Sequence, residues 1–241
     1  MLNVIYEDNH IIVVEKPVNV PTQEDKTGDK DMLSLIKEYI KEKYQKPGNV
    51  YVGLVHRLDR PVGGIMIFAK TSKAASRLSE SIRVKDFQKT YLAVVHNDNL
   101  KEEAVLEDYM WKNEALNKSM VVSKDKHGAK LARLNYKIIE SVSLINENKF
   151  ETKQDGLLKN KTRNLSLVKI NLETGRHHQI RVQFASRNNS LYGDQKYGNG
   201  PKGEQIALWA YQIHFKHPVK DEWMTFECKP KKIGIWSNFK I

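Results

Sequence analysis

Short apolar runs bounded by polar turns recur along this chain, and they constrain its fold more than any other feature. The clearest examples are residues 11–14 and 65–69. Runs of this length are typical of β-strands and are far too short to cross a bilayer. Further strands are predicted at residues 4–6, 51–55, 91–95, 121–122, 131–139, 165–172 and 208–215.

Only a few segments show the helical period. Within residues 31–46 the apolar side chains fall on one helical stripe, and Pro47-Gly48 ends the pattern. A second helix is predicted through about Arg83, with Thr71 or Ser72 as its N-cap. Many strands with sparse helices predict an α+β fold with a largely antiparallel sheet.

Two polar stretches interrupt the strand pattern. Residues 100–117 are acidic and are expected to be irregular, and residues 143–164 are expected to form a long connection between two strands. Neither stretch separates segments that have complete cores of their own. We therefore expect residues 1–241 to form a single domain.

The charge balance suggests a polyanionic partner. The chain has 40 Lys and Arg residues against 29 Asp and Glu, which gives a net charge of +11. Nucleic acid is the commonest partner of so basic a chain, although charge for solubility alone is the alternative. Cys228 is the single cysteine, which excludes an internal disulfide framework and a cysteine zinc cage. With no signal-peptide pattern and no heptad repeat, we expect a cytoplasmic protein that binds no membrane and is a monomer.

A loop with one carboxylate between two arginines is the first candidate for chemistry. Asp59 lies between Arg57 and Arg60, and Gly63-Gly64 follow, where a ligand or a second backbone can approach closely. Nearby guanidinium groups keep a carboxylate ionised, so Asp59 is suited to act as a nucleophile or base. The alternative is a loop aspartate held in a structural salt bridge.

Two further segments could take part in binding. Residues 173–183 are rich in planar donors that suit phosphate, base edges or a carboxylate, and a helix there would place His177 and Arg181 on one face. The histidines could equally be surface residues, and no third ligand at a usual spacing supports zinc. Tyr91 begins a predicted strand, where it packs in the core or presents its ring to a nucleobase.

Taken together and in order, these segments resemble the RluA-type pseudouridine synthases over nearly the whole chain. The matching motifs are Lys16-Pro17, His56-Arg57-Leu58-Asp59, Lys89-Thr90-Tyr91, the run from Thr174 to Arg181, and Leu191-Tyr192-Gly193-Asp194 with Tyr197-Gly198. The resemblance implies an isomerase that converts uridine to pseudouridine in ribosomal or transfer RNA. It also implies a mixed, mainly antiparallel central sheet with flanking helices and a central catalytic cleft, and no cofactor or metal.

The resemblance also implies roles for individual residues. Asp59 would be the nucleophile or base acting on a flipped-out uridine. Tyr91 would lie against the target uracil, and Ile180 would pack in the uracil pocket. Arg181 would form an ion pair with Asp59, and Arg57 would fill the gap left by the flipped base.

The chain departs from the family pattern in two places. Val62-Gly63 stand where the family commonly reads Thr-Ser, which removes hydroxyls behind the loop but leaves Asp59 untouched. We also expect the catalytic domain alone, without the small N-terminal RNA-binding domain of some members. Two other functions stay open: a non-catalytic RNA-binding or ribosome-assembly protein, and a hydrolase that acts on nucleosides.

Overall fold

The computed structural model describes residues 2–152 and 158–241, and the chain forms two compact units. The first unit comprises Met1–Tyr91, Asn171–Glu173 and Leu208–Pro230. The second comprises Leu92–Ile170, Thr174–Ala207 and Lys231–Ile241. Because the units are built from interleaved stretches of chain, neither corresponds to one continuous piece of sequence, and the single-domain expectation stays a prediction.

The first unit is built around two strands without an exposed side. Residues 11–14 of β2 and 65–69 of β4 are completely buried, so their side chains form the core on both faces of the sheet. β1, β3 and β11 pair antiparallel with their neighbours, whereas β10 runs parallel to β4. The strands of this unit are β1 (Asn3–Glu7), β2 (Ile11–Lys16), β3 (Gly53–Leu54), β4 (Gly63–Ala69), the start of β5 (Gln88–His96), β10 (Leu208–Lys216) and β11 (Trp223–Glu227).

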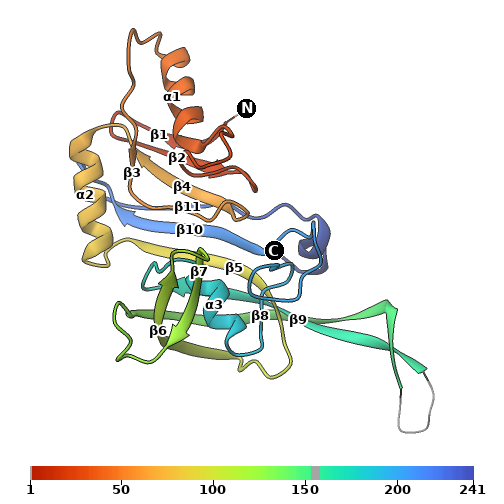
Figure 1. Ribbon diagram of the computed structural model, residues 1–241. Coiled ribbons are helices and arrows are strands. Elements are labelled where there is room, and N and C mark those ends of the chain that lie inside the picture. Colours follow the sequence, from red (N-terminus) through yellow and green to blue (C-terminus); the bar gives the residue numbers. More distant parts are fainter. Residues whose placement is uncertain (1, 153–157) are drawn as a thin grey trace. The chain divides into compact units, whose positions relative to one another are not determined.

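Both helices predicted from the sequence belong to this unit. α1 (Met32–Lys43) begins after Asp31, whose carboxylate accepts a hydrogen bond from the Ser34 amide. α2 (Ser72–Arg83) begins after Thr71, whose hydroxyl accepts one from the Ala74 amide. α2 packs against β3 and β4 and buries Ala74 and Leu78 (Figure 1). Of the two residues predicted to cap the second helix, Thr71 is confirmed, and α1 ends slightly earlier than expected.

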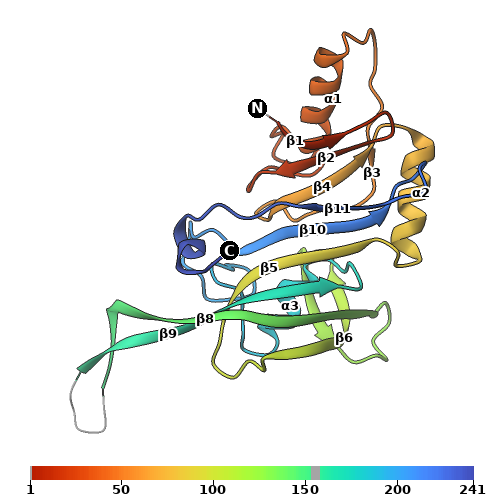
Figure 2. The same ribbon diagram turned by 180° about the vertical axis from the view of Figure 1, so that it is seen from behind.

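The second unit is a mainly antiparallel sheet with a short helix on one face. β6 pairs antiparallel with both β7 and β8, and the strand order is β9-β8-β6-β7. β8 and β9 run as a long two-stranded ribbon that extends beyond the other strands of this unit (Figure 2). Its elements are the rest of β5, β6 (Glu103–Asn113), β7 (Lys118–Val122), β8 (Lys130–Thr152), β9 (Leu158–Leu172), α3 (Gln179–Ala185) and the 3-10 helix η1 (Gly234–Asn238).

Three local predictions are wrong. Residues 100–117 are not irregular, because β6 occupies most of them. Residues 143–164 are not only a connection, since β8 and β9 continue into them, and residues 153–157 lie outside the described residues. α3 begins only at Gln179, so His177 precedes the helix and does not share a helical face with Arg181.

The pairing pattern agrees with the predicted fold class, a mixed and mainly antiparallel sheet with flanking helices. None of the helices in residues 2–152 and 158–241 is long and apolar enough to cross a membrane.

Candidate active site

In the first unit, the loop that carries Asp59 is fixed on both sides of the carboxylate. The Thr22 hydroxyl donates to the Leu58 carbonyl at 2.9 Å and accepts from the Leu58 amide at 3.3 Å. The Val62 amide donates to the Asp59 carbonyl at 3.0 Å, which closes a tight turn. Because the backbone on each side of Asp59 is hydrogen-bonded, the carboxylate is held in a defined place before any ligand arrives.

Lys16 lies beneath this loop and is completely buried. Its ammonium donates to the carbonyls of Pro17, Arg60 and Val62 at 2.9, 3.0 and 2.7 Å. Burial lowers the pKa of Lys16 to about 7, and the charge of Asp59 acts in the opposite direction. Hydrogen bonds from Lys16 therefore connect the Lys16-Pro17 motif with the loop that carries Asp59. The sequence did not predict this role.

Tyr91 also belongs to this unit and interacts with Asp59. It is buried near the middle of β5. Burial raises the pKa of its hydroxyl, and the Asp59 carboxylate adds to that rise. Asp59 thus acts electrostatically on both Lys16 and Tyr91, so three of the motifs quoted above meet at one place.

The two arginines beside Asp59 have different environments. Arg57 is exposed. Arg60 turns to the preceding loop, where it forms ion pairs with Asp25 and Asp29. The Arg60 side chain is therefore held by ion pairs within the protein, whereas the Arg57 side chain is exposed to solvent.

His56, the first residue of the His56-Arg57-Leu58-Asp59 motif, is neutral and packs within the first unit. Its Nε2 accepts a hydrogen bond from the Ile67 amide at 3.2 Å, so the proton lies on Nδ1. Burial lowers the pKa of His56 to about 3, and the charge of Lys89 lowers it further. No described residue accepts a hydrogen bond from Nδ1.

Gly63 explains one departure from the family pattern. A Cβ atom at this position would lie 2.3 Å from the Trp209 ring, so the missing side chain makes room for that indole. The Trp209 Nε1 in turn donates to the Cys228 carbonyl at 2.7 Å. The absence of a serine here is therefore matched by a large neighbour, and the Asp59 loop keeps its hydrogen bonds.

The second unit contains Ile180 and Arg181, both buried on α3. Arg181 donates through Nε and Nη2 to the two carboxylate oxygens of Asp194, at 2.9 and 2.8 Å. Burial alone would raise the pKa of Asp194, but hydrogen bonds from Arg181 and two backbone amides hold it below its usual value. Asp194 belongs to the Leu191-Tyr192-Gly193-Asp194 motif, but the sequence did not indicate that it pairs with Arg181. The pairing of Arg181 with Asp59, which belongs to the other unit, stays a prediction.

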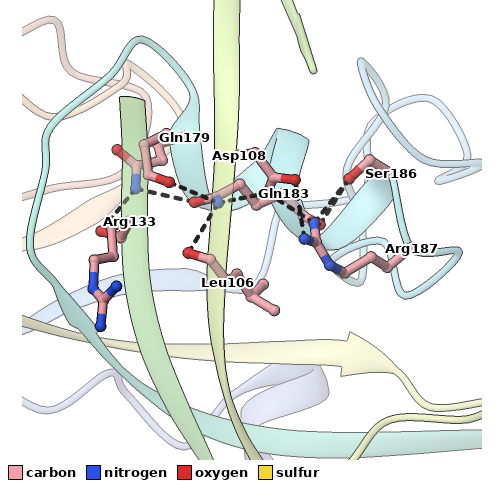
Figure 3. Close-up of polar contacts among 8 residues, drawn as sticks. Leu106, Asp108, Arg133, Gln179, Gln183, Ser186 and Arg187 are labelled. Carbon is pink, nitrogen blue, oxygen red and sulfur yellow. Dashed lines mark hydrogen bonds and ion pairs between the residues drawn. The ribbon is translucent and has the colours of Figure 1, made fainter. Parts of the chain in front are cut away.

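A buried network of amide side chains anchors α3 to its sheet (Figure 3). The Gln183 Nε2 donates to the Asp108 carboxylate at 2.7 Å, and the Gln179 Nε2 donates to Gln183 at 3.0 Å. Arg187 closes the network with two hydrogen bonds to Asp108, at 2.9 and 3.0 Å. Because buried amides must be satisfied, this network fixes the helix that carries Ile180 and Arg181.

The described residues, 2–152 and 158–241, contain no group of three His, Cys, Asp or Glu side chains placed to hold a metal ion.

The RNA pseudouridylate synthase family model matches residues 10–186. An uncharacterized RNA pseudouridine synthase of Bacillus subtilis is 30% identical over 229 residues, which are 94% of this chain and 68% of that protein. The ribosomal large subunit pseudouridine synthase C of Rickettsia bellii is 30% identical, over 93% of this chain and 67% of that protein. The solved human RNA pseudouridylate synthase domain containing 4 superimposes with a TM-score of 0.70 at 18% identity, over 95% of this chain and 89% of that one.

The chain belongs to the RNA pseudouridylate synthase family, and the resemblance to RluA-type enzymes is confirmed. It is a pseudouridine synthase, an isomerase that rearranges uridine within RNA. The solved relatives have the same fold, so the predicted fold class is confirmed as well.

Proposed function

We propose that this enzyme converts uridines of ribosomal RNA to pseudouridine, with Asp59 as the nucleophile or base. Relatives from Rickettsia bellii and from Neisseria meningitidis are named ribosomal large subunit pseudouridine synthases C and D, which supports a ribosomal substrate over a transfer RNA. Such a substrate would place the enzyme in the cytoplasm. The net charge of +11 suits a polyanionic partner of this kind.

The observation that carries the proposal is the position of Asp59 among three motifs of its unit. Its charge acts on Lys16 and on Tyr91. The Val62 amide donates to the Asp59 carbonyl, and Thr22 holds the backbone of the preceding residue, Leu58. A carboxylate whose backbone is held in place can be aimed at one atom of the substrate, as a nucleophile or base requires. Asp59 then either attacks the sugar or ring to form a covalent adduct, or removes a sugar proton to leave a glycal.

The remaining residues have supporting roles in this proposal. The bond from ribose to the uracil nitrogen breaks, the ring turns, and a ring carbon rejoins the ribose. Tyr91 and Ile180, both buried, hold the detached uracil between them, and Arg181 pairs with Asp59. Arg57 is exposed and stacks into the space that the flipped nucleotide leaves in the RNA.

The decisive experiment substitutes Asp59→Asn and incubates the purified protein with ribosomal and transfer RNA. Chemical labelling of pseudouridine then scores the product. We expect the variant to lose pseudouridine formation by at least about a thousandfold, as removal of a catalytic nucleophile does, with RNA binding and the unfolding midpoint nearly unchanged. Asp98→Asn, which alters an exposed carboxylate, is the matched control and should behave like the wild type.

Each other outcome contradicts part of the proposal. Substantial turnover by Asp59→Asn would remove Asp59 from its catalytic role. Binding of RNA by the wild type without any labelled site would favour a non-catalytic RNA-binding protein. Release of free uracil would indicate a nucleoside hydrolase, and labelling confined to transfer RNA would overturn the ribosomal substrate.

A further inference from the structure

A second concave site lies within the second unit, between the β6–β7 hairpin and the segment that leads into α3. Its volume is about 320 Å³, within the range of small-ligand pockets. The residues that matter for its chemistry are Trp111, Lys112, Glu114, Lys130, Arg176 and His177. None of these residues belongs to the predicted uracil site.

Cations outnumber carboxylates around this pocket. Glu114 is paired with Lys112 at 2.5 Å, so those two charges largely cancel. Lys130 and Arg176 are exposed and form no ion pair with any described residue. The Arg176 side chain is held in place, because its Nε donates to the Leu131 carbonyl at 2.8 Å. The lining therefore offers two cationic groups to an anion.

Trp111 adds an aromatic surface to the same pocket. The Lys126 ammonium lies over its ring, 4.9 Å from the centroid. An exposed cation–π contact is worth about 0.5–1 kcal/mol, whereas a stacked base contributes about 1–3 kcal/mol. A base can therefore replace Lys126 on the ring, and the displaced ammonium becomes available to a phosphate.

Side-chain contacts connect this pocket with Arg181. The His177 and His178 rings stack at 3.7 Å between centroids. His178 Nδ1 and the Tyr197 hydroxyl lie 2.7 Å apart, and the Arg181 guanidinium lies 5.2 Å from the Tyr197 centroid. A nucleotide in the pocket would thus bind to the same short segment that carries the predicted uracil-site residues.

We propose that this pocket binds a single-stranded nucleotide of the substrate RNA outside the target uridine. The base stacks on Trp111, and the adjoining phosphates contact Lys130 and Arg176. The proposal depends on the proposed function, since it assigns the pocket to the same RNA substrate. A cationic groove with an aromatic platform is the combination by which proteins hold single strands without reading sequence.

The test of the base contact measures binding of a short oligouridylate to the full chain. Trp111→Leu should weaken binding about tenfold, whereas Trp111→Phe, which keeps a stacking face, should stay within about threefold of the wild type. An abasic oligonucleotide of equal length should bind both variants equally, because it has phosphates but no bases. Circular dichroism verifies that each variant is folded.

The test of the phosphate contacts measures affinity against salt concentration. The double variant Lys130→Gln/Arg176→Gln should reduce the slope of log affinity against log salt by roughly 1.4, at about 0.7 for each single-strand phosphate. Lys37→Gln/Lys41→Gln, which removes two exposed charges from α1, is the matched control and should leave the slope unchanged.

Oligouridylate binding by folded Trp111→Leu at wild-type affinity would overturn the base contact. A slope unchanged in the double variant, or reduced equally in the control, would overturn the phosphate contacts. Neither measurement requires turnover, so these failures are distinct from a failure of the proposed function, which is scored only by pseudouridine labelling.

Discussion

Each unit buries one cation near its predicted site residues, and the two cations are satisfied in different ways. Lys16 is completely buried and donates to three backbone carbonyls. Arg181 is 6% exposed and donates to both oxygens of the Asp194 carboxylate. A buried charge without such partners would cost several kcal/mol.

The difference matters for chemistry. The carbonyls that accept from Lys16 are uncharged, and the Asp59 carboxylate acts on the ammonium through its charge. Asp194 neutralises Arg181, so this arginine contributes fixed donors more than net charge. We therefore expect the Arg181–Asp194 pair to contribute chiefly to the free energy of unfolding. Lys16 should contribute chiefly to the conformation of the loop that carries Asp59.

The largest effect is expected when the Arg181–Asp194 pair is broken. Arg181→Met leaves the Asp194 carboxylate buried without its guanidinium, and should lower the free energy of unfolding by about 3–5 kcal/mol. Urea unfolding measures this change in the free energy of unfolding. Arg83→Met, which breaks an exposed pair with Glu80, is the control and should cost less than about 1 kcal/mol.

The double variant Arg181→Met/Asp194→Leu sharpens this prediction. Removing both charges should restore most of the lost stability, because an apolar pair can replace a buried ion pair. If the double variant is as unstable as the single one, the loss comes from packing and the assigned role of Asp194 is wrong. Any activity of Arg181→Met must therefore be measured on protein shown to be folded.

The sequence predicts most elements because their burial follows simple periods. β6 shows where that reasoning fails. Its outward residues include Val105 and Tyr109, while Asp108 points inward to Gln183 and Arg187. Apolar side chains therefore lie on the exposed face of β6, and a polar one lies on its inner face. The alternation expected of a half-buried strand is lost, and the sequence does not predict a strand here. A carboxylate bonded in this way is recognisable only when its partners, far along the chain, are placed beside it.

The same limit applies to the candidate site. Motif order was sufficient to identify the family and to select Asp59, Tyr91 and Arg181. It could not reveal that Lys16 supports the Asp59 loop, because contacts to carbonyls leave no side-chain signature in the sequence. Nor could it pair Arg181 with Asp194, since that contact depends on how the loop after α3 folds back.

A smaller loss is expected for Lys16→Met. Three carbonyls lose their donor, which is partly offset because a buried charge is removed too, and unfolding should require about 2 kcal/mol less at pH 7. The kcat for pseudouridine formation should fall at least about tenfold, because the Arg60 and Val62 carbonyls beside Asp59 lose the donor that holds them in place. Lys46→Met, at an exposed position, is the control. A stable variant with wild-type kcat would show that Lys16 does not position the loop.

The smallest effect is a dependence of stability on pH, and it comes from the buried Lys16. Burial lowers the pKa of Lys16 to about 7, below its unfolded value. Above pH 7 the unfolded chain therefore holds more protons than the folded one, and stability rises with pH. The free energy of unfolding of the wild type, relative to Lys16→Met, should increase by roughly 1 kcal/mol between pH 6 and pH 8. Arg83→Met should follow the wild-type pH profile over that interval, because the pKa of Arg83 is raised and that of its partner Glu80 is lowered, so neither group titrates there. Parallel curves for the wild type and Lys16→Met would mean that Lys16 keeps its proton throughout, and that its carbonyl partners stabilise the charge as fully as a carboxylate does.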